Sequence, residues 1–225
     1  MRAVAVLCIA LFAHCFADPQ PCSYPSQWES YFGERLRTKS TTSETMTVVM
    51  GNIYADEVAQ RAAEHFTVFQ SGKPMQITII ADFSVHAMVV VYPDTQQCQR
   101  VPLTQSMNPQ AIFPDANYMS SFRWGHGDNA VTINQWFAKL VVDKPWPQQI
   151  EYYQMVTTDE CVPVVEQGTN RLNGVTVDFD ASFSDFNTTI TNPNAFVPPA
   201  YCQGAPIVDN PGPLVQGLMM RFIKY

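Results

Sequence analysis

Two observations predict a mainly β chain, folded as an antiparallel sandwich or an open barrel. Short runs with apolar residues at every second position recur along the sequence, and turns rich in Pro, Gly and Asn separate them. Long stretches of helical periodicity are scarce. The chain has 225 residues, of which 46% are hydrophobic and 15% charged, so it is too apolar to be disordered and long enough to build a core of its own.

The predicted strands follow one another from residue 45 onward. In the first strand, Met46, Val48 and Met50 share one face. The run MVVVY at residues 88–92 ends at a Pro-Asp turn, and VTVDFDASF at residues 175–183 alternates almost without fault. The complete set comprises residues 45–50, 76–80, 88–92, 130–133, 140–142, 149–156 and 175–183.

Two segments depart from this pattern. Residues 55–66, ADEVAQRAAEHF, are rich in Ala and Glu, and their intrinsic propensity predicts a helix. The tail after Cys202 contains several Gly and Pro residues and is loop-like as far as residue 213. Residues 214–223 are apolar enough to pack against the core as a closing strand or a short helix.

The N-terminus, residues 1–17, has the pattern of a secretory signal peptide, with Arg2 as its basic start and Ala17 before the cleavage point. Its ten-residue apolar run is too short to cross a membrane, which takes about 20 apolar residues. No later stretch is long and apolar enough to do so. We therefore expect a secreted protein that is not transmembrane, with a single domain at residues 18–225.

Four cysteines remain after this leader, Cys22, Cys98, Cys161 and Cys202. An even number in an oxidising compartment predicts two disulfides, and four cysteines allow three pairings. Asn187 begins the only N-glycosylation sequon, Asn-Thr-Thr, which predicts an exposed position and a glycoprotein.

The composition excludes several classes of function. With 13 basic and 20 acidic residues the net charge is −7, so no basic face is available for nucleic acid. The sequence carries no motif of a serine-nucleophile elbow, a zinc protease or a phosphate-binding loop. His126 lies in the run Gly-His-Gly-Asp-Asn, which is typical of a turn between strands. We therefore predict a non-enzymatic protein that requires no cofactor.

One acidic stretch would suit Ca²⁺. In a strand, Asp178 and Asp180 point to one face while Phe179 and Phe183 point to the other, and Asp185 follows shortly after. Carboxylate oxygens are the ligands that Ca²⁺ prefers. The alternative, which we favour, is a solvated outer face of a half-buried sheet.

An ordered set of motifs resembles the ependymin-related family. These motifs are PCSYPSQWE at residues 21–29, TQQC at 95–98, LTQ at 103–105, Ile112-x-Pro114, VTINQW at 131–136, ECVPV at 160–164 and NPNAFVPPAYCQ at 192–203. Each motif is short, but together they cover nearly the whole chain after the leader. The family pattern has two further cysteines that are missing here, one of them near the C-terminus. The resemblance implies the pairs Cys22–Cys161 and Cys98–Cys202.

The same resemblance implies two stacked, curved antiparallel sheets that form a half-open barrel around a deep hydrophobic pocket, as in bacterial lipoprotein-carrier folds. It also implies a strand within residues 55–66, against the helix propensity, and a homodimer. Family members bind hydrophobic or lipid-like molecules, and calcium is associated with several. A hydrophobic small molecule or lipid is thus the expected partner, and the candidate pocket-lining residues are Met46, Val48, Met50, Met88, Val90, Phe122 and Trp124.

The sequence therefore predicts a secreted binder or carrier of a hydrophobic ligand, with the lysosome as an alternative destination. The second hypothesis is a calcium-responsive extracellular-matrix or cell-adhesion glycoprotein, with Asp178, Asp180 and Asp185 as metal ligands. An open apolar cavity would favour carriage, and a space filled by the chain's own side chains would favour a structural role. Composition alone favours the filled core, whereas the resemblance favours the cavity.

Overall fold

The computed structural model describes residues 19–70, 72–107, 109–142, 148–172 and 174–212, together with Leu214, Val215, Leu218 and Phe222 near the C-terminus. The predicted signal peptide, residues 1–17, lies outside the described residues. Within the described part, no helix has the length and apolar character needed to cross a membrane.

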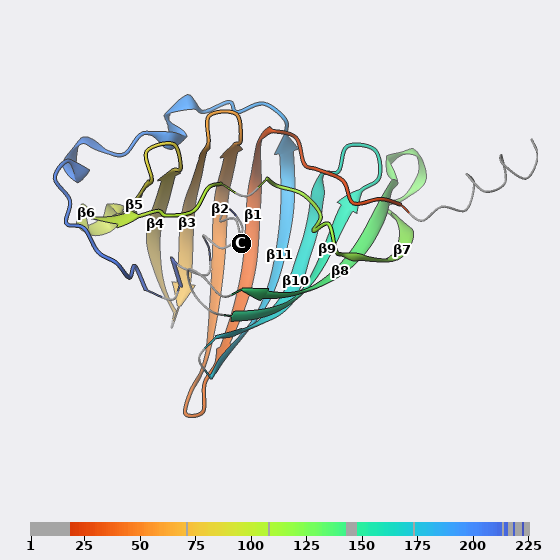
Figure 1. The fold of residues 1–225 in the computed structure, drawn as a ribbon, viewed down its shortest axis with the longest axis horizontal. Helices are drawn as coiled ribbons and strands as arrows, with labels where there is room; N and C mark the ends of the chain where they lie inside the picture. Colours follow the sequence, from red (N-terminus) through yellow and green to blue (C-terminus); the bar gives the residue numbers. More distant parts are fainter. Residues whose placement is uncertain are drawn as a thin grey trace, which may run out of the picture.

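In the described part of the chain, eleven strands form one antiparallel sheet in the spatial order β6-β5-β4-β3-β2-β1-β11-β10-β9-β8-β7. Two meanders, β1 to β6 and β7 to β11, are joined where β1 pairs with β11, and the sheet ends at β6 and β7 without closing (Figure 1). The strands are β1 (Gln27–Lys39), β2 (Glu44–Asp56), β3 (Arg61–Gln70), β4 (Lys73–Asp82), β5 (Ala87–Tyr92), β6 (Gln97–Pro102), β7 (Asn117–Trp124), β8 (Val131–Val142), β9 (Gln148–Thr157), β10 (Pro163–Leu172) and β11 (Val175–Asn187).

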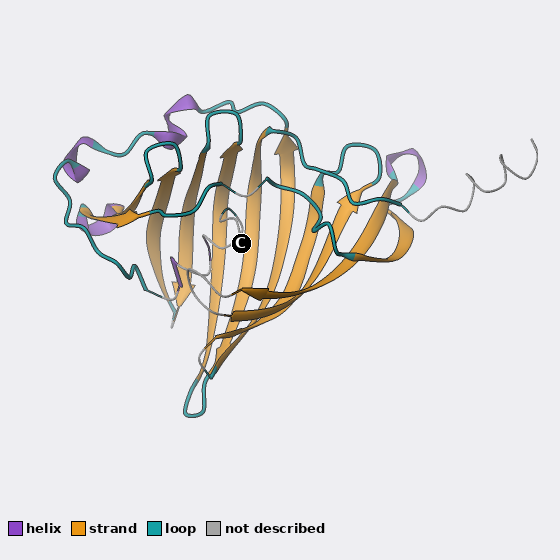
Figure 2. Cartoon of the chain, in the orientation of Figure 1, coloured by secondary structure: helices purple, strands orange, loops and turns teal. Residues whose placement is uncertain are grey.

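The predicted fold class, a mainly antiparallel β structure left open as a half-barrel, is confirmed. The two stacked sheets that the resemblance implies are, in the structure, a single sheet that curves along its length (Figure 2). Such a sheet curves because the right-handed twist between strands accumulates across many of them.

The helix that propensity predicts over residues 55–66 is wrong. Strand β2 runs to Asp56, a turn follows, and β3 begins at Arg61. Ala62 and Ala63 point to opposite faces of β3, yet each is only 1% exposed. The small side chains therefore let both faces of the strand be covered closely, and this tertiary context outweighs helix propensity.

The main hydrophobic core lies on one face of the sheet, which we call the inner face. Alternate residues of both meanders contribute to it, so side chains far apart in the sheet order belong to one cluster. It includes Trp28, Phe32, Val49, Ile53, Phe66, Val68, Ile77, Ile79, Met88 and Val90 from the first meander and Trp136, Val156, Ala181 and Phe183 from the second.

The opposite, outer face is covered in part by a segment that we call the strap, residues 188–208. Its turns η3 (Pro193–Phe196) and η4 (Ala200–Cys202) run past the end of the first meander (Figure 1). Ala195 and Phe196 pack on Tyr54, Ala63 and Ile80, which alternate with inner-face residues. The strap ends beside the edge strand β6, where Ile207 forms a parallel bridge with Arg100, so this edge is protected from pairing with another chain.

Both implied disulfides are present. Cys22 is bonded to Cys161, with 6.0 Å between the Cα atoms, and Cys98 to Cys202, with 5.3 Å. They close loops of 139 and 104 residues. In the chain-entropy model each loop of this length contributes about 5 kcal/mol to stability. One bridge attaches the N-terminal arm to the turn after β9, and the other attaches the strap to β6.

Candidate functional site

The seven candidate pocket residues do not come together. Met88 and Val90 lie on the inner face and are fully buried. Met46, Val48 and Met50 share a face, as predicted, but it is the outer one, because Thr47 and Val49 between them point inward. Met46 is accordingly 54% exposed. Phe122 and Trp124 lie on the edge strand β7, 37% and 48% exposed.

The inner face is covered by loops and chain ends, not by a second sheet. The connection from β6 to β7 crosses the sheet (Figure 1) and inserts Leu103, Met107 and Ile112 into the core. The N-terminal arm adds Tyr24, and its backbone pairs with that connection through Tyr24 N to Gln110 O at 2.8 Å.

Three side chains near the C-terminus complete this cover. Val215, Leu218 and Phe222 belong to the same core cluster and are at most 2% exposed. The prediction that the apolar tail packs against the core is confirmed for these residues. The space that the resemblance implies is therefore occupied, at least over this part, by the protein's own side chains. This filling counts toward a structural role, and carriage of a ligand requires that the cover be displaced.

A polar cluster lies on the inner face of the second meander. It consists of Tyr24, Trp136, Gln154 and Glu166, each at most 6% exposed. Gln154 Nε2 donates to the Tyr24 hydroxyl at 3.1 Å, and that hydroxyl donates to Glu166 Oε1 at 3.4 Å. Among the residues that the structure describes, Trp136 Nε1 and Gln154 Oε1 have no hydrogen-bond partner. This cluster was not predicted from the sequence, although Gln154 shares its alternation with the apolar Ile150 and Val156.

A surface pocket lies elsewhere, between the edge strand β6 and the strap. Its volume is ≈ 390 Å³, and its lining residues are Gln97, Cys98, Gln99, Tyr201, Gln203, Gly204, Ala205 and Pro206. This mixed polar lining beside the disulfide does not resemble the continuous apolar surface of the inner face.

The three predicted calcium ligands do not form a site in the structure. Asp180 forms an ion pair with Arg35 at 2.7 Å, and Asp178 accepts a hydrogen bond from Thr169 at 2.8 Å. Asp185 is exposed and has a left-handed backbone, with φ at 51°. Across the described ranges, no group of three His, Cys, Asp or Glu side chains is placed to hold a metal ion. Calcium binding thus stays a prediction.

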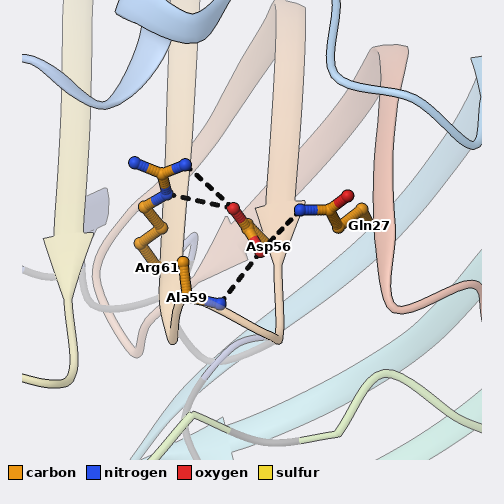
Figure 3. Close-up of polar contacts among 4 residues, drawn as sticks. All are labelled: Gln27, Asp56, Ala59 and Arg61. Carbon is orange, nitrogen blue, oxygen red and sulfur yellow. Dashed lines mark hydrogen bonds and ion pairs between the residues drawn. The ribbon is translucent and has the colours of Figure 1, made fainter.

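A buried carboxylate holds the β2–β3 turn (Figure 3). Asp56 accepts hydrogen bonds from Gln27 Nε2, from the Ala59 amide and from Arg61. Burial alone would raise the pKa of Asp56, but these hydrogen bonds outweigh it, so the pKa lies below its usual value. The Arg61 guanidinium also lies 4.3 Å from the ring centre of Phe196, which connects the turn to the strap.

Two smaller predictions concern turns and modification. Residues 125–129 form the predicted turn between β7 and β8, and His126 is exposed there. Asn187 ends β11 and is half-buried, and its side-chain oxygen accepts from the Thr189 amide at 3.0 Å. Glycosylation at this position stays a prediction.

The model of the Ependymin family matches residues 71–202, which is more than half of the chain. The chain belongs to the ependymin family. This ependymin-family chain is 22% identical over 202 residues to mammalian ependymin-related protein 1 of Mus musculus, covering 90% of this chain and 85% of that protein. It is 23% identical over 223 residues to ependymin of Notemigonus crysoleucas, covering 94% and 95% of the two chains, and 22% identical over 220 residues to ependymin-2 of Carassius auratus, with the same coverage.

Solved structures show weaker likeness to the ependymin-family chain. An uncharacterized conserved protein from Thermus thermophilus superposes with a TM-score of 0.46 and 10% identity, over 83% of this chain and 91% of that one. A DUF1329 family protein from Desulfovibrio piger superposes with a TM-score of 0.35 and 10% identity, over 76% and 89% of the two chains.

Proposed function

We propose that this ependymin-family protein is a secreted, non-enzymatic binder of a hydrophobic or lipid-like molecule, which it holds against the inner face of its sheet. One observation carries the proposal: the large apolar inner face is covered by loops and chain ends instead of a second sheet. Such covers can separate from the face without breaking strand pairs. The two disulfides support an extracellular location.

The free energies of such an exchange are balanced. Uncovering Val215, Leu218 and Phe222 costs roughly 1.5–3 kcal/mol for each side chain, or about 5–9 kcal/mol together. A lipid tail gains about 0.8 kcal/mol per CH₂ when it leaves water, so roughly ten carbons offset that cost. We therefore expect a ligand with a longer chain, for which the exchange is clearly favourable.

Binding is tested with the purified full-length protein. Native mass spectrometry looks for a co-purifying lipid, and a fluorescent fatty-acid probe is titrated in competition with saturated chains of eight to eighteen carbons. We expect affinity to rise steeply once the chain exceeds about ten carbons. A protein that carries no lipid and binds no probe at any chain length contradicts the proposal.

The second hypothesis, calcium-responsive adhesion, depends on the outer-face carboxylates. Ca²⁺ would have to compete with Arg35 for Asp180, which is why we rank it second. Calorimetric titration with Ca²⁺ separates the two functions, because a carrier need not respond to the ion. Heat of binding together with a change in association state would favour adhesion.

A homodimer is the further partner that we propose from the family resemblance. Exposed apolar side chains on the outer face, among them Met46 and Met50, support it, because a soluble protein gains from covering them. Analytical ultracentrifugation measures the association, and a monomer at micromolar concentration would contradict it.

A further inference from the structure

The polar cluster contains two buried atoms without a partner in the described part of the chain. Trp136 and Gln154 lie directly opposite each other on β8 and β9 and are 2% and 4% exposed. No described residue supplies an acceptor to the indole Nε1 or a donor to the amide Oε1. Folded proteins rarely leave such atoms unpaired, because desolvation without a hydrogen bond is unfavourable.

The chemistry of the two atoms defines what would satisfy both. An indole N–H can only donate a hydrogen bond, and an amide oxygen can only accept one. A single group that completes both bonds must therefore accept and donate at once. Among common polar groups, a hydroxyl or an uncharged amide does this, whereas a carboxylate offers only acceptors and an ammonium only donors.

The neighbouring carboxyl argues further for an uncharged group. Glu166 lies directly opposite Gln154 on β10, on the side away from Trp136, and its Oε1 accepts from Tyr24. An anionic group at this buried position would be close to a second carboxyl, with little water to screen the repulsion. On this argument we expect the cluster to disfavour fatty-acid anions.

The surroundings connect this position to the apolar core. The Trp136 ring packs edge-on against Tyr118, with 5.6 Å between ring centres, and it belongs to the same cluster as Val156 and Phe183. The arm that carries Tyr24 is fixed above it by the Cys22–Cys161 disulfide. A polar group held here could extend an apolar tail along the inner face.

We propose that Trp136 and Gln154 form a head-group subsite for an uncharged amphiphile that carries a hydroxyl or an amide, such as a long-chain alcohol, a monoacylglycerol or a fatty amide. This inference rests on the proposed function, since the tail occupies the inner face. Trp136 Nε1 donates a hydrogen bond to the head-group oxygen, and Gln154 Oε1 accepts one from the hydroxyl or the amide N–H of the ligand.

The test compares ligands with one tail and different head groups. Hexadecanol, palmitamide and palmitate compete with a fluorescent probe on the full-length protein at neutral pH. We expect the alcohol and the amide to bind about tenfold more tightly than the carboxylate, as one additional satisfied hydrogen bond and one avoided repulsion would give.

The matched variants are Trp136→Phe and Trp28→Phe. The first removes the donor and keeps an aromatic ring, so the advantage of alcohol and amide over palmitate should fall about fivefold or more. Trp28 is an equally buried indole of the same core that packs edge-on against Tyr24 but does not lie opposite Gln154. Its replacement should change the affinity for all three ligands alike and leave their order unchanged. Thermal unfolding confirms that both variants fold.

The outcomes separate this inference from the proposed function. If no ligand with a sixteen-carbon tail binds, the proposed function fails. If all three ligands bind equally, if palmitate binds best, or if Trp136→Phe keeps the wild-type preference, the head-group subsite is wrong while binding of the tail stands.

Discussion

Replacing Phe222 by Ala should increase the affinity for long apolar ligands. Phe222 is fully buried in the core cluster. Its truncation should lower the free energy that holds the C-terminal cover on the sheet by about 3–5 kcal/mol when the surrounding side chains do not fill the space. When a ligand must displace this cover, its observed affinity is the intrinsic affinity multiplied by the fraction of molecules that are uncovered. Even 1.4 kcal/mol of the loss would raise affinity about tenfold, and the full amount would raise it more than a hundredfold.

The assay is titration of a fluorescent fatty-acid probe, with urea unfolding measured on the same samples. The control is Phe66→Ala, because Phe66 is an equally large, buried side chain of the same core but belongs to the sheet, in strand β3. Phe66→Ala should lower stability without a gain in affinity. If Phe222→Ala binds the probe no better than the wild type, or if both variants change affinity alike, the C-terminal side chains are core and not a displaceable cover.

Three other predictions concern stability and modification. Asp56→Asn should lower the free energy of unfolding at pH 7 by about 1–3 kcal/mol, because Arg61 loses its charged partner. The folded-state pKa of Asp56 is depressed, so its contribution to stability is present above the unfolded-state value near 4 and is lost as the pH falls through the lower folded-state value. Urea unfolding should therefore show the difference between wild type and variant shrinking as the pH is lowered below about 4. Replacing Cys98 and Cys202 together by Ser should cost up to about 5 kcal/mol and expose the strap to limited proteolysis, which intact-mass analysis of the fragments would locate. Asn187→Gln should remove a glycan-sized mass from the secreted protein on denaturing gels, and an unchanged mass would show that the sequon is unused.

The alternation of residues predicted the strands but could not assign their faces. In residues 175–183 the alternation correctly separates Phe183, which is buried, from Asp178, which is exposed. In β2 the same rule placed Met46 and Met50 together, but period-2 alternation does not say which face is inside. The structure turns Thr47 and Val49 inward, where they are 4% and 0% exposed.

The missed elements share a physical cause. In strand β3, Ala62 packs in the main core and Ala63 packs against the strap. Neither contact can be deduced from the local sequence. The polar cluster did leave a signal, since Gln154 breaks an apolar series that includes Ile150 and Val156. Its partners Tyr24 and Trp136 are distant in sequence, so only the fold brings them together.

The pattern of covalent attachment indicates which cover can move. The N-terminal arm is bonded to the turn after β9 through Cys22, and the strap is bonded to β6 through Cys98. No cysteine lies between Cys202 and Tyr225, so no disulfide within this segment fixes Val215, Leu218 and Phe222, which pack in the inner-face core. Apolar packing can be exchanged for an apolar guest at little net cost, whereas a disulfide cannot. A ligand that enters the hollow should therefore displace the C-terminal side chains and leave the arm, with the polar cluster beneath it, in place.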